Sequence, residues 1–474
     1  MGDPKGFIKY RRSTPERLPV AERIHSWKEF YQPFPAVKLK NQAARCMDCG
    51  VPFCQSSSGC PVENLIPDWN DLVFRDRWED ALKSLHSTNN FPEFTGKLCP
   101  APCESACVLG IPSDPVAIRN IESAIIERGF NEGWVRPEPP AKRTGRRVAI
   151  IGSGPCGLAA AQQLSRAGHS VTVFEKAAKP GGLLRYGIPE FKMEKTVLDR
   201  RLDQLRAEGI EFRTGTHVGV SFPAEALRSD FDAVCVASGA ERARDLPIRG
   251  RDLRGVHLAM DYLIHQNLTL EGAPSELDES MNAYGKHVVV IGGGDTGSDC
   301  IGTAHRQGCL SVTQLEILPE PPMERSPNTP WPYWPMRLRT SHAHEEGCDR
   351  KWNVSATECI EKNGAVHALR MLKVNDRFEP EGGQESGVEI RADLVLLAVG
   401  FTGPVTEGLI QQLGVGLDTR GNLVTDARYM TTVNGVFAAG DARRGASLIV
   451  WAIAEGRKMA DAVHQYLTGP SENT

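Results

Sequence analysis

The 474-residue sequence lacks any hydrophobic run long enough to cross a membrane, since a spanning helix needs about 18 or more apolar residues in succession. Its first residues also lack the apolar core of a secretion signal. Charge of one sign is not in excess, because 55 Lys and Arg stand against 59 Asp and Glu. A net charge of −4 excludes the basic footprint typical of nucleic-acid-binding proteins. We therefore expect a cytoplasmic protein with neither a membrane nor a nucleic-acid partner.

Two residue types are abundant instead, with 46 glycines and 13 cysteines in the chain. Seven of the cysteines fall between Cys46 and Cys107. Thiols stay reduced in the cytosol, so clustered cysteines there indicate metal binding or redox chemistry rather than disulfides. The length predicts roughly three domains of about 150 residues each.

The pattern of apolar residues divides the chain into a helical region and an α/β region. Residues 1–145 show helix-like stretches at 69–87 and 116–129, and they end in a Pro-rich linker. Buried-strand patterns at 147–151 and 287–291 are each followed at once by glycine, which is typical of Rossmann-like units. Further strands are expected within 231–239, 392–400 and 433–441, and a C-terminal helix within 447–465. The predicted fold class is α/β, with a helical domain before two Rossmann-like domains, and the predicted domains are 1–145, 146–285 with 400–474, and 286–399.

The first glycine turn opens an Ala-rich helix directly after the strand at 147–151. Gly152 permits the tight turn, Gly154 lets the backbone approach a pyrophosphate, and Gly157 lets the helix pack closely on the strand. The helix N-terminus then faces the phosphates. Glu175 ends the next strand, about 20 residues further on, where a carboxylate accepts hydrogen bonds from a ribose. This combination predicts a dinucleotide-binding unit.

The second turn repeats this design after the strand at 287–291, with the sequence Gly292-Gly-Gly294-Asp295-Thr296-Gly297. Glu316 ends the following strand. An acid there is typical of NAD, whereas NADP needs an arginine near its 2′-phosphate. Arg306 and Arg325 are the candidate arginines, although each could equally be a solvated surface residue. The turn alone therefore favours NAD.

The seven clustered cysteines have spacings that let a short loop surround a metal centre, in the pattern Cys46-x2-Cys49-x4-Cys54-x5-Cys60 and Cys99-x3-Cys103-x3-Cys107. A proline follows Cys60 and Cys99, as it often does in iron–sulfur sequences. Zinc is the alternative, because Cys-x2-Cys also forms zinc sites. Two [4Fe–4S] clusters would need one ligand more than the seven cysteines supply. The remaining six cysteines are expected to pack in the core.

Segments along essentially the whole chain resemble the small-subunit family of glutamate synthase. They lie at 6–11, 45–54, 180–189, 330–335 and 440–451. The N-terminal region also resembles dihydropyrimidine dehydrogenase, and the remainder resembles the flavoproteins with two dinucleotide-binding domains. These resemblances imply FAD, two [4Fe–4S] clusters and NADPH as cofactors. They also imply a large-subunit partner in a hetero-oligomer.

The flavoprotein resemblance assigns FAD to the first turn and NADPH to the second. The implied FAD residues are Gly152, Gly154, Gly157, Glu175, Gly182, Arg185, Val218, Gly440 and Asp441. The implied nicotinamide residues are Gly292, Gly294, Asp295, Thr296, Gly297 and Arg306. For Asp441 the alternative is a turn residue that caps the next helix.

The resemblance to dihydropyrimidine dehydrogenase assigns the cluster ligands. It gives one cluster Cys46, Cys49, Cys54 and Cys107, and the other Cys60, Cys99 and Cys103. The eighth ligand of the relative is a glutamine, and the matching position here is Glu122. A carboxylate can ligate iron, but Glu122 could also be an ordinary helix-surface acid.

The resemblance predicts an electron-input subunit that oxidises NADPH through FAD and passes electrons through the clusters to a large subunit. That subunit would make L-glutamate from L-glutamine and 2-oxoglutarate. Hydride transfer to a flavin needs no side-chain nucleophile, so we expect no catalytic residue. Residue 2 is Gly2, so the chain has no Cys nucleophile of the amidotransferase kind after Met1. The alternatives are a paralogous reductase that serves ferredoxin or a pyrimidine reductase, and a zinc-stabilised scaffold. The aromatic-proline stretch 331–335 is expected at an interface or as a buried loop anchor.

Overall fold

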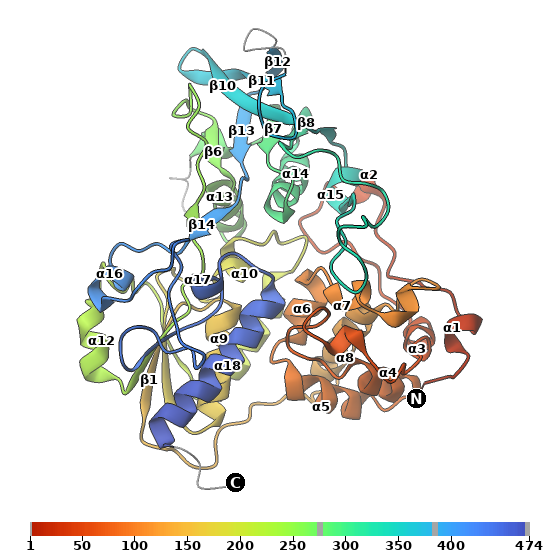
Figure 1. Ribbon diagram of the computed structural model, residues 1–474, viewed down its shortest axis with the longest axis vertical. Coiled ribbons are helices and arrows are strands. Elements are labelled where there is room, and N and C mark those ends of the chain that lie inside the picture. Colours follow the sequence, from red (N-terminus) through yellow and green to blue (C-terminus); the bar gives the residue numbers. More distant parts are fainter. Residues whose placement is uncertain (1, 273–277, 382–386, 470–474) are drawn as a thin grey trace.

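The computed structural model describes residues 2–272, 278–381 and 387–469, and the chain forms three lobes (Figure 1). The helical N-terminal region makes one lobe, coloured red to orange. Each glycine turn lies in a lobe of its own that is built on a parallel sheet. The fold therefore confirms the predicted order, in which a helical domain precedes two Rossmann-like domains.

The helical lobe packs around fully buried aromatic and branched side chains, among them Trp69, Phe91 and Ile125. The stretch predicted as one helix at 69–87 is two helices, because the chain turns at Asp76 with φ of 63°. The other predicted helix forms as α8, with apolar residues on its buried face. The helices of this lobe are α1 (Gly6–Lys9), α2 (Val20–Arg23), α3 (Ala36–Ala44), α4 (Ile66–Phe74), α5 (Trp78–Thr88), α6 (Pro92–Leu98), α7 (Pro102–Ser105) and α8 (Ile118–Asn131).

The first sheet has five parallel strands in the order β15-β4-β1-β2-β3. Their bounds are β1 (Arg147–Ile151), β2 (Ser170–Phe174), β3 (Glu211–Arg213), β4 (Ala233–Val236) and β15 (Val436–Ala438). Strand β15 comes from the end of the chain and pairs with β4, so this lobe is discontinuous, as the sequence predicts. Helices α9 (Pro155–Arg166), α10 (Leu183–Tyr186), α11 (Lys195–Ala207), α12 (Ala224–Asp230), α16 (Leu409–Leu413), α17 (Asp441–Arg444) and α18 (Ile449–Thr468) complete it.

The second sheet, in the order β6-β13-β7-β8-β9, is also parallel. It begins at β6 (Val256–Leu258), well before the expected boundary at residue 286, and α13 (Ala259–Leu270) follows it. The short β6 strand lacks the long apolar run that reveals β7, so the sequence pattern places the boundary too late. The other strands and helices of the sheet are β7 (His287–Ile291), β8 (Ser311–Leu315), β9 (Asp349–Lys351), β13 (Leu394–Leu397), α14 (Asp295–Gln307) and α15 (His342–Glu345).

Two smaller elements complete this half of the chain. Strands β5 (Arg242–Ala243) and β14 (Phe401–Gly403) pair antiparallel where the chain leaves the first sheet and returns to it. An antiparallel sheet of β10 (Val354–Lys362), β11 (Ala365–Lys373) and β12 (Val388–Arg391) lies at the far end of the second parallel lobe (Figure 1).

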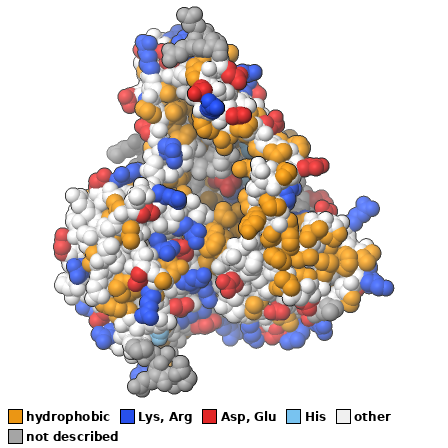
Figure 2. Space-filling view, viewed as in Figure 1, with side chains coloured by type: hydrophobic (Ala, Val, Ile, Leu, Met, Phe, Trp, Pro, Cys, Tyr) orange, Lys and Arg blue, Asp and Glu red, His pale blue; other side chains and the backbone are white. Residues whose placement is uncertain are grey.

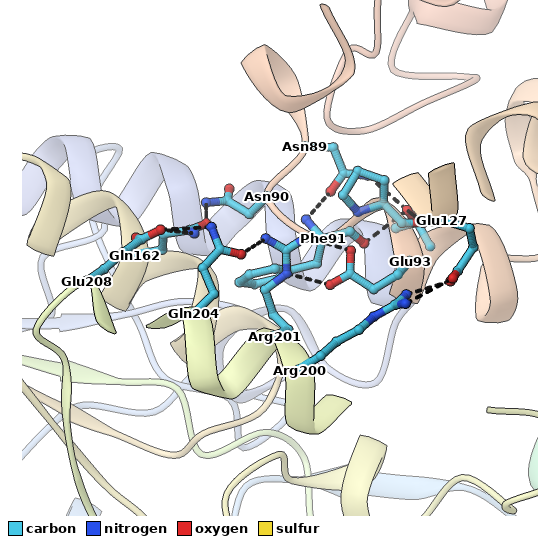
Figure 3. Close-up of polar contacts among 12 residues, drawn as sticks. Asn89, Asn90, Phe91, Glu93, Glu127, Gln162, Arg200, Arg201, Gln204 and Glu208 are labelled. Carbon is cyan, nitrogen blue, oxygen red and sulfur yellow. Dashed lines mark hydrogen bonds and ion pairs between the residues drawn. The ribbon is translucent and has the colours of Figure 1, made fainter. Parts of the chain in front are cut away.

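A buried polar network joins the helical lobe to the first Rossmann-like lobe (Figure 3). Arg201 on α11 donates two hydrogen bonds to Glu93 on α6, at 2.6 and 2.9 Å. Arg200 makes a second, more exposed fork to Glu127. Since these contacts cross between two lobes, they fix the position of the cysteine-bearing helices relative to the first sheet.

Candidate functional site

The first glycine turn has the geometry that its sequence predicts. Gly152 has φ of 102°, and a Cβ there would lie 2.4 Å from the Ala237 carbonyl oxygen. A Cβ on Gly157 would lie 2.0 Å from the Gly152 oxygen, so the helix can approach the strand only without a side chain. At Gly154 a Cβ would meet no atom within 4 Å. The open side of the turn is therefore at Gly154, where the backbone can approach a pyrophosphate.

Glu175 lies beside this turn and is buried. Its Oε2 accepts hydrogen bonds from the backbone nitrogen of Ser153 at 3.2 Å and from the Ser153 hydroxyl at 2.5 Å. The same hydroxyl accepts a bond from the Gly181 nitrogen at 2.8 Å. Gly182, with φ of 55°, comes so close that a Cβ there would lie 3.0 Å from the Gly154 Cα. The Gly-Gly turn after Glu175 thus packs directly on the phosphate turn.

The C-terminal segment closes the same site. Gly440 has φ of 68°, and its backbone nitrogen donates to Glu455 at 3.0 Å. Asp441 begins α17 and accepts a bond from the Ser447 hydroxyl at 2.7 Å, and burial raises the pKa of the Asp441 carboxyl. Helix α18 lies against α9 at Gly456, where a Cβ would be 2.3 Å from the Cys156 oxygen. The sequence motifs do not predict this close contact at Gly456. The feature that indicates it is a glycine inside an otherwise helical pattern.

Two predicted FAD residues lie in less open surroundings. Arg185 is 3% exposed, and its guanidinium pairs with Asp199 and lies 3.6 Å from Glu271. Val218 is also 3% exposed and belongs to the apolar cluster behind the first sheet. The charge of Arg185 is therefore already paired within the protein.

The second glycine turn repeats the clearances of the first. A Cβ on Gly292 would lie 2.2 Å from the Ala398 oxygen, one on Gly297 would lie 2.5 Å from the Gly292 oxygen, and one on Gly294 would meet nothing within 4 Å. Asp295 and Thr296 begin α14. Thr296 also lines a pocket together with Met260, Leu258, Leu397, Ala398, Gly400 and Phe401. The pocket lies beside the turn, at the carboxyl edge of the second sheet, where open α/β sheets bind ligands.

Arg306 is not at this turn, which corrects the prediction that it binds the coenzyme. It lies in the last turn of α14, and a helix rises about 1.5 Å per residue, so roughly 16 Å of helix separates it from Asp295. Its side chain is 1% exposed and donates to Glu346 at 2.7 and 3.1 Å. Arg23 pairs with the same carboxylate at 2.7 Å. Arg306 thus holds the N-terminal segment on the second Rossmann-like lobe.

The seven clustered cysteines form two groups. Burial, and then the charge of neighbouring thiols, raises the pKa of Cys54. Its thiol neighbours are Cys107, Cys46, Cys49 and, last, Cys60. Burial also raises the pKa of Cys46 to about 12, and Cys107 and Cys49 contribute. Within this first group Cys49 is exposed, so the group reaches the protein surface.

The second group surrounds one cavity, lined by Cys60, Cys99, Cys103 and Glu122. All three of its cysteines are buried, and so is Glu122. Burial raises the pKa of the Glu122 carboxyl to about 7, against the hydrogen bonds that it accepts. The first residues of α18 reach this cavity, because Val450 lines it as well. Helix α18 therefore connects the second cysteine group with the site around Asp441.

Glu122 has one fixed oxygen and one free oxygen. Its Oε1 accepts hydrogen bonds from Asn64 at 3.1 Å, Asn89 at 3.0 Å and Thr95 at 2.9 Å. Across residues 2–272, 278–381 and 387–469, no donor reaches Oε2. A buried carboxylate with an unused oxygen beside three thiols is a suitable donor set for an iron–sulfur cluster. Within those same ranges, no three His, Cys, Asp or Glu side chains are grouped tightly enough to hold a single metal ion.

Comparisons with known proteins agree with the division of the chain into a cysteine-bearing helical region and a region with two glycine turns. A family model described as pyridine nucleotide-disulphide oxidoreductase matches residues 146–456, and one described as dihydropyrimidine dehydrogenase domain II, 4Fe-4S cluster, matches residues 23–134. The "Glutamate synthase [NADPH] small chain" of Mycobacterium tuberculosis is 57% identical over 99% of this chain and 97% of that protein. The protein of the same name from Bacillus subtilis is 48% identical over 99% of both. The chain belongs to the glutamate synthase small-chain family.

Membership of the glutamate synthase small-chain family confirms the predicted resemblance, the fold class and the electron-input function of an NADPH oxidoreductase. The two family models also confirm a flavin and nicotinamide site and at least one iron–sulfur cluster. The "Glutamate synthase [NADH]" of Schizosaccharomyces pombe is likewise 48% identical, over 96% of this chain and 22% of that protein. Names in this family therefore include both nicotinamide coenzymes.

A solved structure shows the same two-lobed fold outside the helical region. "Mycobacterium tuberculosis FprA in complex with NADPH" aligns with a TM-score of 0.54 and 20% identity over 67% of this chain and 83% of that chain.

In the described ranges no helix has both the length and the apolar character to cross a bilayer. Of the two readings of the stretch 331–335, the contacts support an interface between domains, because the ring of the half-buried Trp331 lies 4.7 Å from that of Phe53 on the helical lobe.

Proposed function

We propose that this small chain carries two [4Fe–4S] clusters and FAD, oxidises NADPH, and delivers electrons to a large glutamate synthase subunit in a hetero-oligomer. We also expect the protein to be located in the cytoplasm. The domains would have the predicted bounds with one change: the nicotinamide domain would begin at β5 (Arg242–Ala243) instead of at residue 286. The observation that carries the proposal is the cavity where three thiols and Glu122 converge, next to a separate group of four thiols.

Each turn would position one dinucleotide. The open side of Gly154 and the N-terminus of α9 would receive the pyrophosphate of FAD, with Glu175 on its ribose. Gly294 and the N-terminus of α14 would do the same for the nicotinamide coenzyme. When bound, the coenzyme and the flavin supply hydride chemistry and the clusters carry single electrons. The protein would contribute position, exclusion of water and the polar contacts of Asp441.

The ligand sets would be Cys46, Cys49, Cys54 and Cys107 for one cluster, and Cys60, Cys99, Cys103 and Glu122 for the other. The second set would be the one nearer the flavin, since Val450 in the first turn of α18 lines its cavity, and Glu455 on the same helix accepts the bond from the Gly440 nitrogen beside Asp441. The first set would face the partner, because Cys49 is exposed. Figure 2 shows hydrophobic side chains gathered on one face of the helical lobe, which is a suitable surface for a partner.

Metal analysis of Glu122 variants tests the proposal. The purified chain is expected to hold about eight iron atoms, four per cluster, and an equal amount of acid-labile sulfide. Glu122→Ala should lose about half of the iron while keeping the flavin, and Glu122→Gln should keep more, because an amide oxygen can still ligate. Glu127→Ala, on the same helix but paired with Arg200 near the surface, is the matched control. Zinc without sulfide, or full iron in Glu122→Ala, would overturn the ligand assignment.

The partner is tested with the intact chain and a recombinant large subunit. With NADPH, the chain alone should reduce artificial dyes without forming glutamate. Adding the large subunit together with glutamine and 2-oxoglutarate should start glutamate formation. Continued dye reduction with no glutamate in the presence of the large subunit would favour the alternative, a paralogous reductase for another acceptor.

A further inference from the structure

An arginine lies among the residues of the second cysteine group. Arg119 lines the same cavity as Cys60, Cys99, Cys103 and Glu122. Its Nη1 donates a hydrogen bond to the carbonyl oxygen of Cys99 at 3.1 Å, so the backbone of a proposed ligand holds the guanidinium. Glu122 follows three residues later on α8, and residues three apart are neighbours on a helix surface. The charge of Arg119 therefore lies beside the proposed ligands.

This charge has no carboxylate partner of its own. Arg119 is half-buried, and in the part of the chain that the structure describes no Asp or Glu forms an ion pair with its guanidinium. Glu104 accepts a bond from the Arg119 backbone nitrogen at 3.0 Å, but the charge of Glu104 is matched by Arg12. Arg119 also lies in the first turn of α8, where the helix dipole disfavours a positive charge. A cation at this position indicates that another negative group compensates it.

The cofactor proposed for this cavity would supply the negative charge. Three thiolates and the Glu122 carboxylate would bring four negative charges, which exceed the positive charge of a [4Fe–4S] core, and an accepted electron adds one more. The reduction potential of a cluster depends on this net charge. All three cysteines and Glu122 are buried, so salt and solvent screen the charge only weakly. A cation on the wall of the cavity would therefore stabilise the reduced state.

We infer that Arg119 raises the reduction potential of the second cluster by offsetting the negative charge that Glu122 adds to its ligand set, and so enables this cluster to accept single electrons from the flavin. The inference rests on the proposed function, in which this set holds the cluster nearer the flavin. Arg119 is a positioning residue in this role, because it acts through its charge and does not ligate iron.

A redox titration of the complete, cluster-loaded chain, followed by electron paramagnetic resonance, tests the inference. The signal that is missing in Glu122→Ala identifies the second cluster. A unit charge within about 12 Å, at an effective dielectric constant of about 20, changes an equilibrium constant by about tenfold. Arg119→Gln should therefore lower the potential of the second cluster by about 59 mV, the equivalent of tenfold for one electron. Arg119→Lys keeps the charge and should keep most of the potential.

A double-variant cycle tests whether Arg119 and Glu122 offset each other. Glu122→Gln keeps an oxygen ligand but removes one negative charge, so it should raise the potential. Glu122→Gln combined with Arg119→Gln removes one charge of each sign and should return the potential close to that of the unmodified chain. A double variant whose potential stays as high as that of Glu122→Gln would show that Arg119 has no such effect, and would overturn the inference.

Arg128→Gln is the matched control on the same helix. Arg128 lies nine residues after Arg119, which is about 14 Å along α8. Its side chain is 39% exposed and pairs with Glu132 at 3.7 Å. Because solvent screens an exposed charge at that distance, Arg128→Gln should change the reduction constant of the second cluster by less than about twofold. A shift equal to that in Arg119→Gln would overturn the inference.

Iron, sulfide and flavin analysis of each variant separates the remaining failures. An unchanged potential in Arg119→Gln, with full iron and flavin, would overturn the inference and leave the proposed function intact. Loss of the second cluster from either Arg119 variant would also overturn it, because the residue would then act on cluster retention. The same holds if the second cluster of the unmodified chain stays oxidised at every potential reached. Absence of a second cluster from the unmodified chain would instead overturn the proposed function.

Discussion

The buried Arg201–Glu93 pair provides a quantitative test of how the helical lobe is attached (Figure 3). The side chains of Arg201 and Glu93 are 1% and 0% exposed, and two short bonds join them. Arg201 also lies over the rings of Phe91 and Phe130, at 5.5 and 5.0 Å. Breaking such a pair leaves an unpaired charge in a low-dielectric setting.

Arg201→Ala should therefore lower the free energy of unfolding by about 3–5 kcal/mol. The control is Lys83→Ala, since the Lys83–Glu79 pair on α5 is 67% and 54% exposed. An exposed pair of this kind contributes about 0.3–0.5 kcal/mol. Replacing both partners together, as Arg201→Met with Glu93→Leu, removes the buried charges and should recover most of the loss.

Urea unfolding of the flavin-loaded chain measures these differences. Tryptophan fluorescence follows unfolding of the whole chain, whose eight tryptophans include the buried Trp69 of the helical lobe, and flavin release follows the first Rossmann-like lobe. Arg201→Ala should shift the fluorescence transition to lower urea concentration. A loss within about 1 kcal/mol of that in Lys83→Ala would refute the reasoning, because exposed pairs contribute no more than this. A double variant no more stable than Arg201→Ala would refute it as well.

Three further predictions follow from particular contacts. Gly157→Ala should destabilise the fold by more than about 1 kcal/mol, as overpacking does. Gly154→Ala should lose FAD, and its melting temperature should fall only as far as removal of FAD lowers that of the unmodified chain. Thermal melts and the flavin absorbance distinguish the two variants. Arg306→Ala should cost about 3 kcal/mol in a urea titration, as loss of a buried pair does, yet leave the NADPH/NADH ratio unchanged. Burial lowers the pKa of His86 from 6.5 to about 3, so the unfolded chain binds the extra proton between these values and stability falls as the pH drops through this window. His86→Leu should reduce that slope by up to about 1.4 kcal/mol per pH unit, measured by urea unfolding at several pH values.

Features set by local chemistry could be predicted from the sequence. The roles of Gly152, Gly154 and Gly157 follow from backbone geometry within a few residues, and the structure reproduces the clearances that each role demands. Strands such as β1 and β7 were visible because both of their faces are buried, which gives an unbroken apolar run. The grouping of the cysteines could be stated only through family resemblance, since spacing alone does not show which thiols meet.

Features set by partners far along the chain could not be predicted in this way. Arg306 looked available for a phosphate because nothing near it in the sequence indicates that Glu346 and Arg23 enclose it. Strand β6 has only three residues and follows an irregular stretch, so its membership in the second sheet depends on pairing with β13. In both cases the deciding contact lies many residues away.

Those distant contacts bear on how the lobes are held during electron transfer. Arg201–Glu93 ties the helical lobe to the first sheet, and the N-terminal segment ties it to the second through Arg23 and Glu346. In both pairs each side chain is at most 3% exposed. A rotation that separated either pair would bury unpaired charges or expose apolar surface, at a cost of several kcal/mol. The cysteine groups therefore keep a fixed position relative to both glycine turns. A fixed position suits a chain whose electrons must pass between separate sites, because transfer between fixed centres needs no domain movement.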